Sequence, residues 1–255
     1  MLDKDELIRV DQRGYTVLEA ITPGMRTSAT HSNPHTFVGI DGKTYWIKGR
    51  VQQGLVAELI AGRLTSRLGV GPAARILRVL PTVLAAASAP AELEGIVCGS
   101  EDAADTVNAR ELSQFIADGT FAPNLVDASS RARVIAFHSW LGMGDAQVLV
   151  RLTDGTVFSI DHGDCFGDVA TLVDPTPIVV DIPGVDAAVG KDRSLIRSAV
   201  QRIERLTDRE ILDAVAGIPG GDPWRSPVER RHGIACWLGH RRDRLGGVMD
   251  AWAQT

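Results

Sequence analysis

The hydrophobic pattern of this chain changes near residue 100, and this change constrains the fold more than any other feature. Before it, short β-prone runs alternate with turn residues, and one amphipathic helix lies among them. After it, apolar residues recur at helical spacing in several long segments. The 255 residues are enough for two intimate lobes that share a cleft. We therefore expect an α+β protein, with a small β-rich N-lobe over residues 1–100 and a larger, mostly helical C-lobe over residues 101–255.

The first half predicts a small sheet that carries one helix. Asp41-Gly42 separates two β-branched and aromatic runs, which is a strong hairpin signal because both turn residues accept a positive φ. Leucines at helical spacing predict a helix over residues 55–68, and Gly69 supplies its C-terminal stop. The remainder of the first 100 residues, including the first 50, is expected to be strands, turns and connections. The expected strands cover residues 15–21, 36–40, 44–48, 75–80 and 95–98.

The second half predicts five helices and one hairpin. Two capping-box patterns, at residues 108–111 and 207–210, indicate helix starts because cap and third-residue side chains satisfy each other's backbone donors. The isolated hairpin covers residues 148–160, with Asp154-Gly155 in its turn. The expected helices cover residues 109–118, 128–142, 191–206, 208–216 and 227–246.

Acidic residues flank this second hairpin at both ends. Asp145 precedes it and Asp161 follows it, each close to a glycine. Because a hairpin returns the chain to its start, we expect the two carboxylates to lie close together. Such a pair can share a divalent cation, or one carboxylate can bind the metal while the other orients a nucleophile. Phosphoryl transfer depends on this kind of positioning and charge neutralisation.

A lysine and a glutamate complete the candidate site. Lys48 ends an otherwise apolar strand, and Glu58 lies on the helix that follows. A Lys–Glu pair of this kind holds the ammonium over the phosphates of a nucleotide in protein kinases. The loop over residues 22–30 lies where a kinase has its glycine-rich loop, although an ordinary polar loop explains it nearly as well. Its candidate phosphate contacts are Arg26, Thr27 and Ser28.

Composition excludes several other classes of function. The net charge of −5 argues against binding of nucleic acid or anionic membranes as the main activity, because both need a basic surface. Three scattered cysteines form neither a disulfide framework nor a zinc site, which favours the reducing cytoplasm. The polar N-terminus does not resemble a signal peptide, and no apolar run is long enough to span a bilayer. Neither a P-loop pattern nor a Gly-x-Ser-x-Gly elbow occurs.

Taken together, the motifs resemble the HipA-like kinase domain family, which is distantly related to the HipA toxin kinase and to phosphatidylinositol kinases. The resemblance covers roughly residues 15–245 and rests on the order and spacing of segments 23–26, 41–48, 57–58, 63–64, 68–69, 95–100, 137–145, 159–163 and 229–231. It implies a bilobal protein-kinase-like fold and an ATP-dependent phosphotransferase. The acceptor would be a hydroxyl of an unknown protein or small molecule.

The same resemblance assigns roles to individual residues. Lys48 would bind the ATP phosphates, Glu58 would hold Lys48, Asp145 would be the catalytic aspartate and Asp161 would bind Mg²⁺. Segment 95–100 would approximate the hinge, with the backbone of Val97 and Cys98 facing adenine.

The chain departs from the family pattern at one metal ligand. Such kinases usually carry an asparagine five residues after the catalytic aspartate, but Val150 occupies that position. We expect the loop to be shortened, with Gln147 supplying the missing amide oxygen to the metal. The departure leaves open a nucleotide-binding pseudokinase that acts through protein contacts, and an adenylyltransferase on the same fold is a separate alternative.

Overall fold

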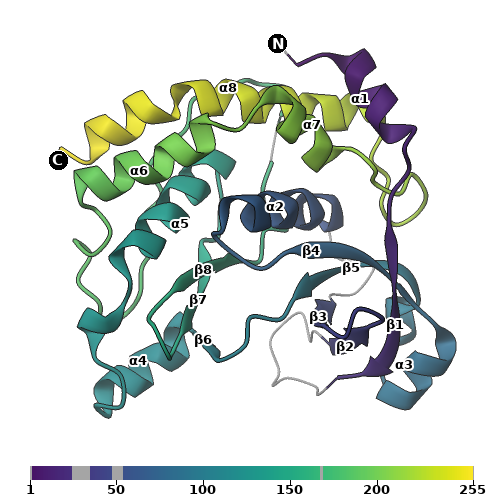
Figure 1. Ribbon diagram of the computed structural model, residues 1–255, viewed down its shortest axis with the longest axis horizontal. Coiled ribbons are helices and arrows are strands. Elements are labelled where there is room, and N and C mark those ends of the chain that lie inside the picture. Colours follow the sequence, from purple (N-terminus) through teal and green to yellow (C-terminus); the bar gives the residue numbers. More distant parts are fainter. Residues whose placement is uncertain (1, 25–34, 48–53, 167–168, 255) are drawn as a thin grey trace.

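The computed structural model describes residues 2–24, 35–47, 54–166 and 169–254, and it has the expected α+β architecture (Figure 1). The N-terminal part is a closed barrel whose strands follow the order β1, β2, β3, β5, β4. Strands β1 and β4 run parallel, whereas the other neighbours are antiparallel. The strands are β1 (Val17–Pro23), β2 (His35–Gly39), β3 (Thr44–Ile47), β4 (Ala74–Val79) and β5 (Gly95–Glu101).

Apolar side chains explain why this barrel closes. Phe37, Tyr45, Ile47, Leu77 and Val97 come from four of its strands and are all completely buried. The expected hairpin forms at Asp41-Gly42, where Gly42 has a φ of +78°. Burying this apolar surface is the main stabilising contribution to the barrel.

Helix α2 (Leu55–Leu68) lies against β4 and β5 and ends at Gly69, as the leucine spacing predicts. Its C-cap glycine has a φ of +64°, a conformation that costs glycine little. The segment after β4 was expected to be strand and connection, but it contains α3 (Pro81–Ala87) and the short 3₁₀ helix η1 (Ala91–Leu93). Pro81 suits the first turn of α3, where no backbone donor is needed.

The expectation that the first 50 residues form strands and turns is wrong for α1 (Lys4–Asp11). Asp3 caps this helix by accepting a hydrogen bond from the backbone of Asp5. Only Leu7 and Val10 within it are buried, so the periodic signal is very short. The helix contacts α7 and α8, so it lies beside the helical part although it precedes the barrel in sequence (Figure 1).

The helical part follows the expected order. Both predicted capping boxes form, at Asn108 and at Thr207. Helix α5 packs against α6 and α8 in the core. No helix among the residues that the structure describes is both long and apolar enough to cross a membrane. The helices are α4 (Ala109–Ala117), α5 (Ala128–Leu141), α6 (Arg193–Glu204), α7 (Asp208–Val215) and α8 (Val228–Trp252), with η2 (Pro123–Leu125) between α4 and α5.

A second small sheet lies between the barrel and these helices. The expected hairpin consists of β7 (Gln147–Arg151) and β8 (Val157–Ile160). A third strand, β6 (Thr106–Asn108), pairs with β7 and was not expected, because three residues carry too little periodicity to be recognised. The expected boundary between residues 100 and 101 falls at the end of β5.

Candidate active site

The β7–β8 hairpin places Asp145 and Asp161 at the same open end. Gln147 pairs with Ile160 in the antiparallel register. Asp145 lies two residues before this pair and Asp161 one residue after it. Asp145 is exposed, whereas Asp161 is partly buried. The strand register therefore agrees with the proximity that the sequence predicts for the two acids.

Gln147 contacts Asp145 directly. Its side-chain Nε2 donates to Oδ2 of Asp145 at 2.7 Å, and its backbone N–H donates to the Asp145 carbonyl at 3.2 Å. With the amide nitrogen engaged in this way, the Gln147 oxygen remains as an acceptor. Two carboxylates and an amide form the all-oxygen donor set that suits Mg²⁺, and their exposure leaves room for water ligands. These residues fit the metal chemically, although the described residues contain no cluster of three or more His, Cys, Asp or Glu.

Glu58 connects the barrel to the segment that follows β8. The residue is only 7% exposed, and its Oε1 accepts a hydrogen bond from Oγ of Ser100 at 3.1 Å. Its Oε2 accepts a hydrogen bond from the backbone N–H of His162 at 2.8 Å. A buried carboxylate requires such partners, because desolvation of an unpaired charge is costly. Glu58 therefore joins α2, β5 and the residue next to Asp161.

The backbone around Asp161 is held in an unusual conformation. Asp161 has a φ of +58°, in the left-handed region that few residues other than glycine adopt. Gly54, at the start of α2, has a φ of +103°, and a Cβ there would lie 2.2 Å from the carbonyl oxygen of Gly163. The beginning of α2 is thus in direct backbone contact with the Asp161–Gly163 segment. Nothing in the sequence spacing predicts this contact.

A buried chain of polar side chains supports the same segment from behind. Nε2 of His138 lies 2.6 Å from Oγ of Ser159, which lies 2.7 Å from Nε2 of His162. All three side chains are nearly inaccessible to solvent. Phe137 contacts His162 edge to face, with ring centroids 5.9 Å apart. His138 is a completely buried core residue, and burial lowers its pKa to about 3.

The carboxylate of Glu58 determines which way the hydrogen bonds of this buried polar chain point. Nδ1 of His162 lies 3.9 Å from Oε1 of Glu58, and neither it nor Nδ1 of His138 has a hydrogen-bond partner among the described residues. A proton on Nδ1 of His162 faces negative charge, whereas a bare lone pair there would be repelled. His138 then donates through Nε2 to Ser159, and Ser159 donates to His162. The charge of Glu58 is therefore coupled to the proton positions on the two buried imidazoles.

The structure says less about the other predicted site residues. Lys48, Arg26, Thr27 and Ser28 lie outside the described residues. Val97 and Cys98 lie inside β5 with buried side chains, paired in register with β4. The chain leaves β5 after Glu101 and reaches β6 through residues 102–105. Contact of Val97 or Cys98 with adenine stays a prediction.

No family model matches this chain, and no curated protein sequence matches it. Among solved structures it is similar to the Helicobacter pylori proinflammatory kinase CtkA, with 13% identity and a TM-score of 0.61, over 94% of this chain and 98% of that one.

Looser similarity extends to two further structures. The Golgi casein kinase with Mn/ADP bound has 11% identity and a TM-score of 0.40, over 98% of this chain and 77% of that one. The open conformation of CtTel1 has 14% identity and a TM-score of 0.46, over 89% of this chain but 11% of that one.

The match to CtkA shows the fold but not the HipA-like family, which stays a prediction. The chain has a protein-kinase-like fold, in which an N-terminal β-sheet that carries α2 precedes a helical C-terminal part.

Proposed function

We propose that this protein is an ATP-dependent phosphotransferase that moves the γ-phosphate of ATP to a hydroxyl of a protein or small molecule. The observation that carries the proposal is the buried Glu58 of α2, which accepts a hydrogen bond from the residue next to Asp161. Protein kinases need the Lys–Glu pair and the metal-binding aspartate in place together. The overall similarity to a protein described as a kinase supports the same conclusion.

The proposed roles of Asp145, Gln147, Asp161 and Glu58 are supported by their positions, and those of the other residues rest on the resemblance described in the sequence analysis. Asp145 orients the acceptor hydroxyl, and Asp161 and Gln147 hold Mg²⁺, which neutralises charge on the phosphates when bound. Lys48 binds the phosphates and is held by Glu58. The remaining nucleotide contacts would come from Arg26, Thr27, Ser28, Val97 and Cys98.

A second candidate function rests on Val150. This residue is completely buried in β7, paired with Val107 and Val157, so no amide at this position can reach a metal. A weakened second metal site would favour a nucleotide-binding pseudokinase, and an altered one is compatible with an adenylyltransferase. Mass spectrometry of an acceptor after incubation with ATP distinguishes these cases, because phosphate, AMP and no addition have different masses.

The decisive experiment is a calorimetric and thermal-shift titration with ATP, with and without Mg²⁺. The variants are Asp161→Asn, Asp145→Asn and, as a matched control, Asp154→Asn at the opposite end of the same hairpin, where Asp154 is exposed and ion-paired with Arg151. At about 100 times the dissociation constant, ATP should stabilise the folded protein by about 2.7 kcal/mol.

Three results together would support the assignment. Mg²⁺ should strengthen binding in the wild type and in Asp154→Asn but not in Asp161→Asn, and Asp145→Asn should bind ATP without turnover. Absence of any nucleotide effect on the wild type would contradict the proposed site.

A further inference from the structure

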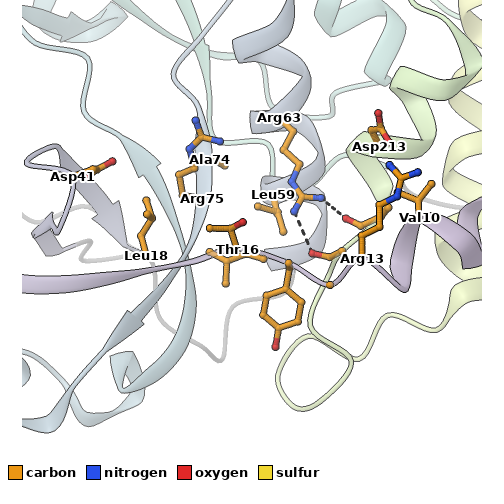
Figure 2. Close-up of a pocket in the computed structure, with 15 residues that line it drawn as sticks. Val10, Arg13, Thr16, Leu18, Asp41, Leu59, Arg63, Ala74, Arg75 and Asp213 are labelled. Atoms are coloured by element: carbon orange, nitrogen blue, oxygen red, sulfur yellow. Dashed lines mark hydrogen bonds between the residues drawn. The ribbon is translucent and has the colours of Figure 1, made fainter.

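A cavity of about 520 Å³ lies beside α2, and neither Asp145 nor Asp161 lines it (Figure 2). Its walls come from α2, β4, the end of α7 and the segment that joins α1 to β1. The volume is within the range of roughly 300–1,000 Å³ that is common for small-molecule sites. None of the described residues that are assigned to the proposed nucleotide site lines it.

Three arginines line this cavity, namely Arg13, Arg63 and Arg75 (Figure 2). Within the part of the chain that the structure describes, no carboxylate lies within ion-pair distance of any of them. Arg13 and Arg75 are exposed, whereas burial lowers the pKa of the Arg63 guanidinium. The neighbouring positive charge of Arg75 lowers the pKa of Arg63 further. The cavity therefore contains positive charge that no described carboxylate contacts within ion-pair distance, although Asp11 acts on Arg63 at longer range and raises its pKa.

Arg63 is fixed in place with part of its donor capacity unused. Its Nη1 donates to the carbonyls of Ala214 and Ala216, and its Nη2 donates to the carbonyl of Gly217 at 3.2 Å. A guanidinium has five N–H groups, so these three bonds leave two N–H groups available. A guanidinium held rigidly in this way loses little conformational entropy when it binds a further acceptor.

The acidic residues of the cavity are already engaged elsewhere. Asp41 accepts hydrogen bonds from the Tyr45 hydroxyl at 2.6 Å and from the Lys43 backbone at 3.2 Å. Asp213 forms an ion pair with Arg209 at 3.0 Å. Neither carboxylate compensates the three arginines directly. This distribution of charge favours an anionic occupant.

The remaining wall is mixed, because apolar side chains lie there together with Thr16, Asp41 and Asp213. Leu18, Leu59 and Ile76 line the cavity beside the arginines, and the exposed ring of Tyr15 lies among the lining residues. We propose that this cavity binds a metabolite-sized anion in which a phosphate or carboxylate group is attached to an apolar or planar skeleton. The anionic group contacts Arg63 together with Arg13 or Arg75, and the skeleton lies on the partly exposed Leu18 and the ring of Tyr15, since Leu59 and Ile76 are buried. The proposal does not depend on phosphotransferase activity.

The test uses the full chain and three simple probes at constant ionic strength, in the presence of EDTA. Phenyl phosphate and benzoate represent the two anionic groups on the same ring, and phenol is the neutral control. Calorimetry should show saturable binding of at least one anion and none of phenol. The stronger of the two anions identifies whether the site prefers phosphate or carboxylate.

The matched variants are Arg13→Gln, Arg75→Gln and Arg78→Gln. Arg78 lies on β4 like Arg75, is also exposed, and forms an ion pair with Glu19 outside the cavity lining. Arg63 is left unchanged because it also holds the end of α7. Arg13→Gln or Arg75→Gln should weaken binding about tenfold, and Arg78→Gln should not.

Two results would overturn the proposal. One is the absence of saturable binding of either anion to the wild type. The other is equal affinity in Arg13→Gln, Arg75→Gln and Arg78→Gln, which would place the probe elsewhere, including in the proposed nucleotide site. These outcomes are distinguishable from a failed ATP titration, because the variants do not alter any residue assigned to that site.

Discussion

Removing the hydroxyl of Ser159 tests the buried polar chain behind Asp161. Ser159→Ala deletes both hydrogen bonds that join the two imidazoles, of 2.6 and 2.7 Å, and leaves two buried nitrogens without partners. Each buried polar group that loses its partner costs about 1–3 kcal/mol. The side chain has no accessible surface, so water cannot easily replace the hydroxyl. We therefore expect the free energy of unfolding to fall by about 3 kcal/mol.

The assay is urea unfolding followed by circular dichroism and tryptophan fluorescence, with a thermal melt in parallel. For a chain of this size, about 3 kcal/mol corresponds to a lowering of Tm by about 6–12 °C. The matched control is Ser113→Ala, because Ser113 is only partly buried and makes a local bond to the Arg110 carbonyl, at 2.6 Å. This control should change stability by less than about 0.5 kcal/mol.

The result also bears on the candidate site. If the tautomers are oriented as the Glu58 charge favours, Ser159→Ala should weaken ATP binding as well, because His162 loses the group that holds its ring. A stability loss below about 1 kcal/mol would refute the reasoning, since it would mean that the two imidazoles find other partners at little cost.

Three further predictions follow from the same geometry. The pKa of His138 is about 3 in the folded state and about 6.5 in the unfolded state. Between these two values only the unfolded state binds the proton, so the free energy of unfolding should fall as the pH drops below 6.5, by about 2 kcal/mol at pH 5. Urea midpoints at pH 7 and pH 5 should show this loss in the wild type, and His138→Gln should show correspondingly less. Gly54→Ala should abolish ATP-dependent stabilisation in a thermal melt, because its Cβ would collide with Gly163, and normal ATP binding would contradict that contact. Arg231→Gln should lower the free energy of unfolding, measured in urea, by about 3–5 kcal/mol. The reason is that the partly buried Asp11 loses the guanidinium that contacts both of its carboxylate oxygens. A loss under about 1 kcal/mol would argue against this ion pair.

Local signals account for the parts of the fold that the sequence predicted. Asp41-Gly42, the two capping boxes and the leucine repeat of α2 each act within a few residues, and each element forms where expected. Helix α1 was missed because its stability depends on contacts with α7 and α8, more than 190 residues away in sequence. Propensity alone rarely stabilises so short a helix in water.

The candidate site likewise contains features that the local sequence predicts and features that only the packed fold reveals. The strand register of a hairpin predicts that Asp145 and Asp161 share one end, and this needs no tertiary information. The bond between Glu58 and the backbone of His162 joins residues 104 positions apart, so only the packed fold reveals it. The same holds for the chain from His138 to His162, which depends on how α5 faces β8.

The attachments of α2 have a mechanical consequence. Although α2 covers the barrel, Arg63 binds it to three carbonyls at the end of α7, and Glu58 binds it to the segment after β8. Both attachments lead to the helical part, although Glu58 also accepts a hydrogen bond from Ser100 of β5, and α2 would have to break several charge-assisted hydrogen bonds to leave the helices. We therefore expect a relative rotation of the two parts to carry α2 with the helices, so that the barrel strands move across the surface of α2.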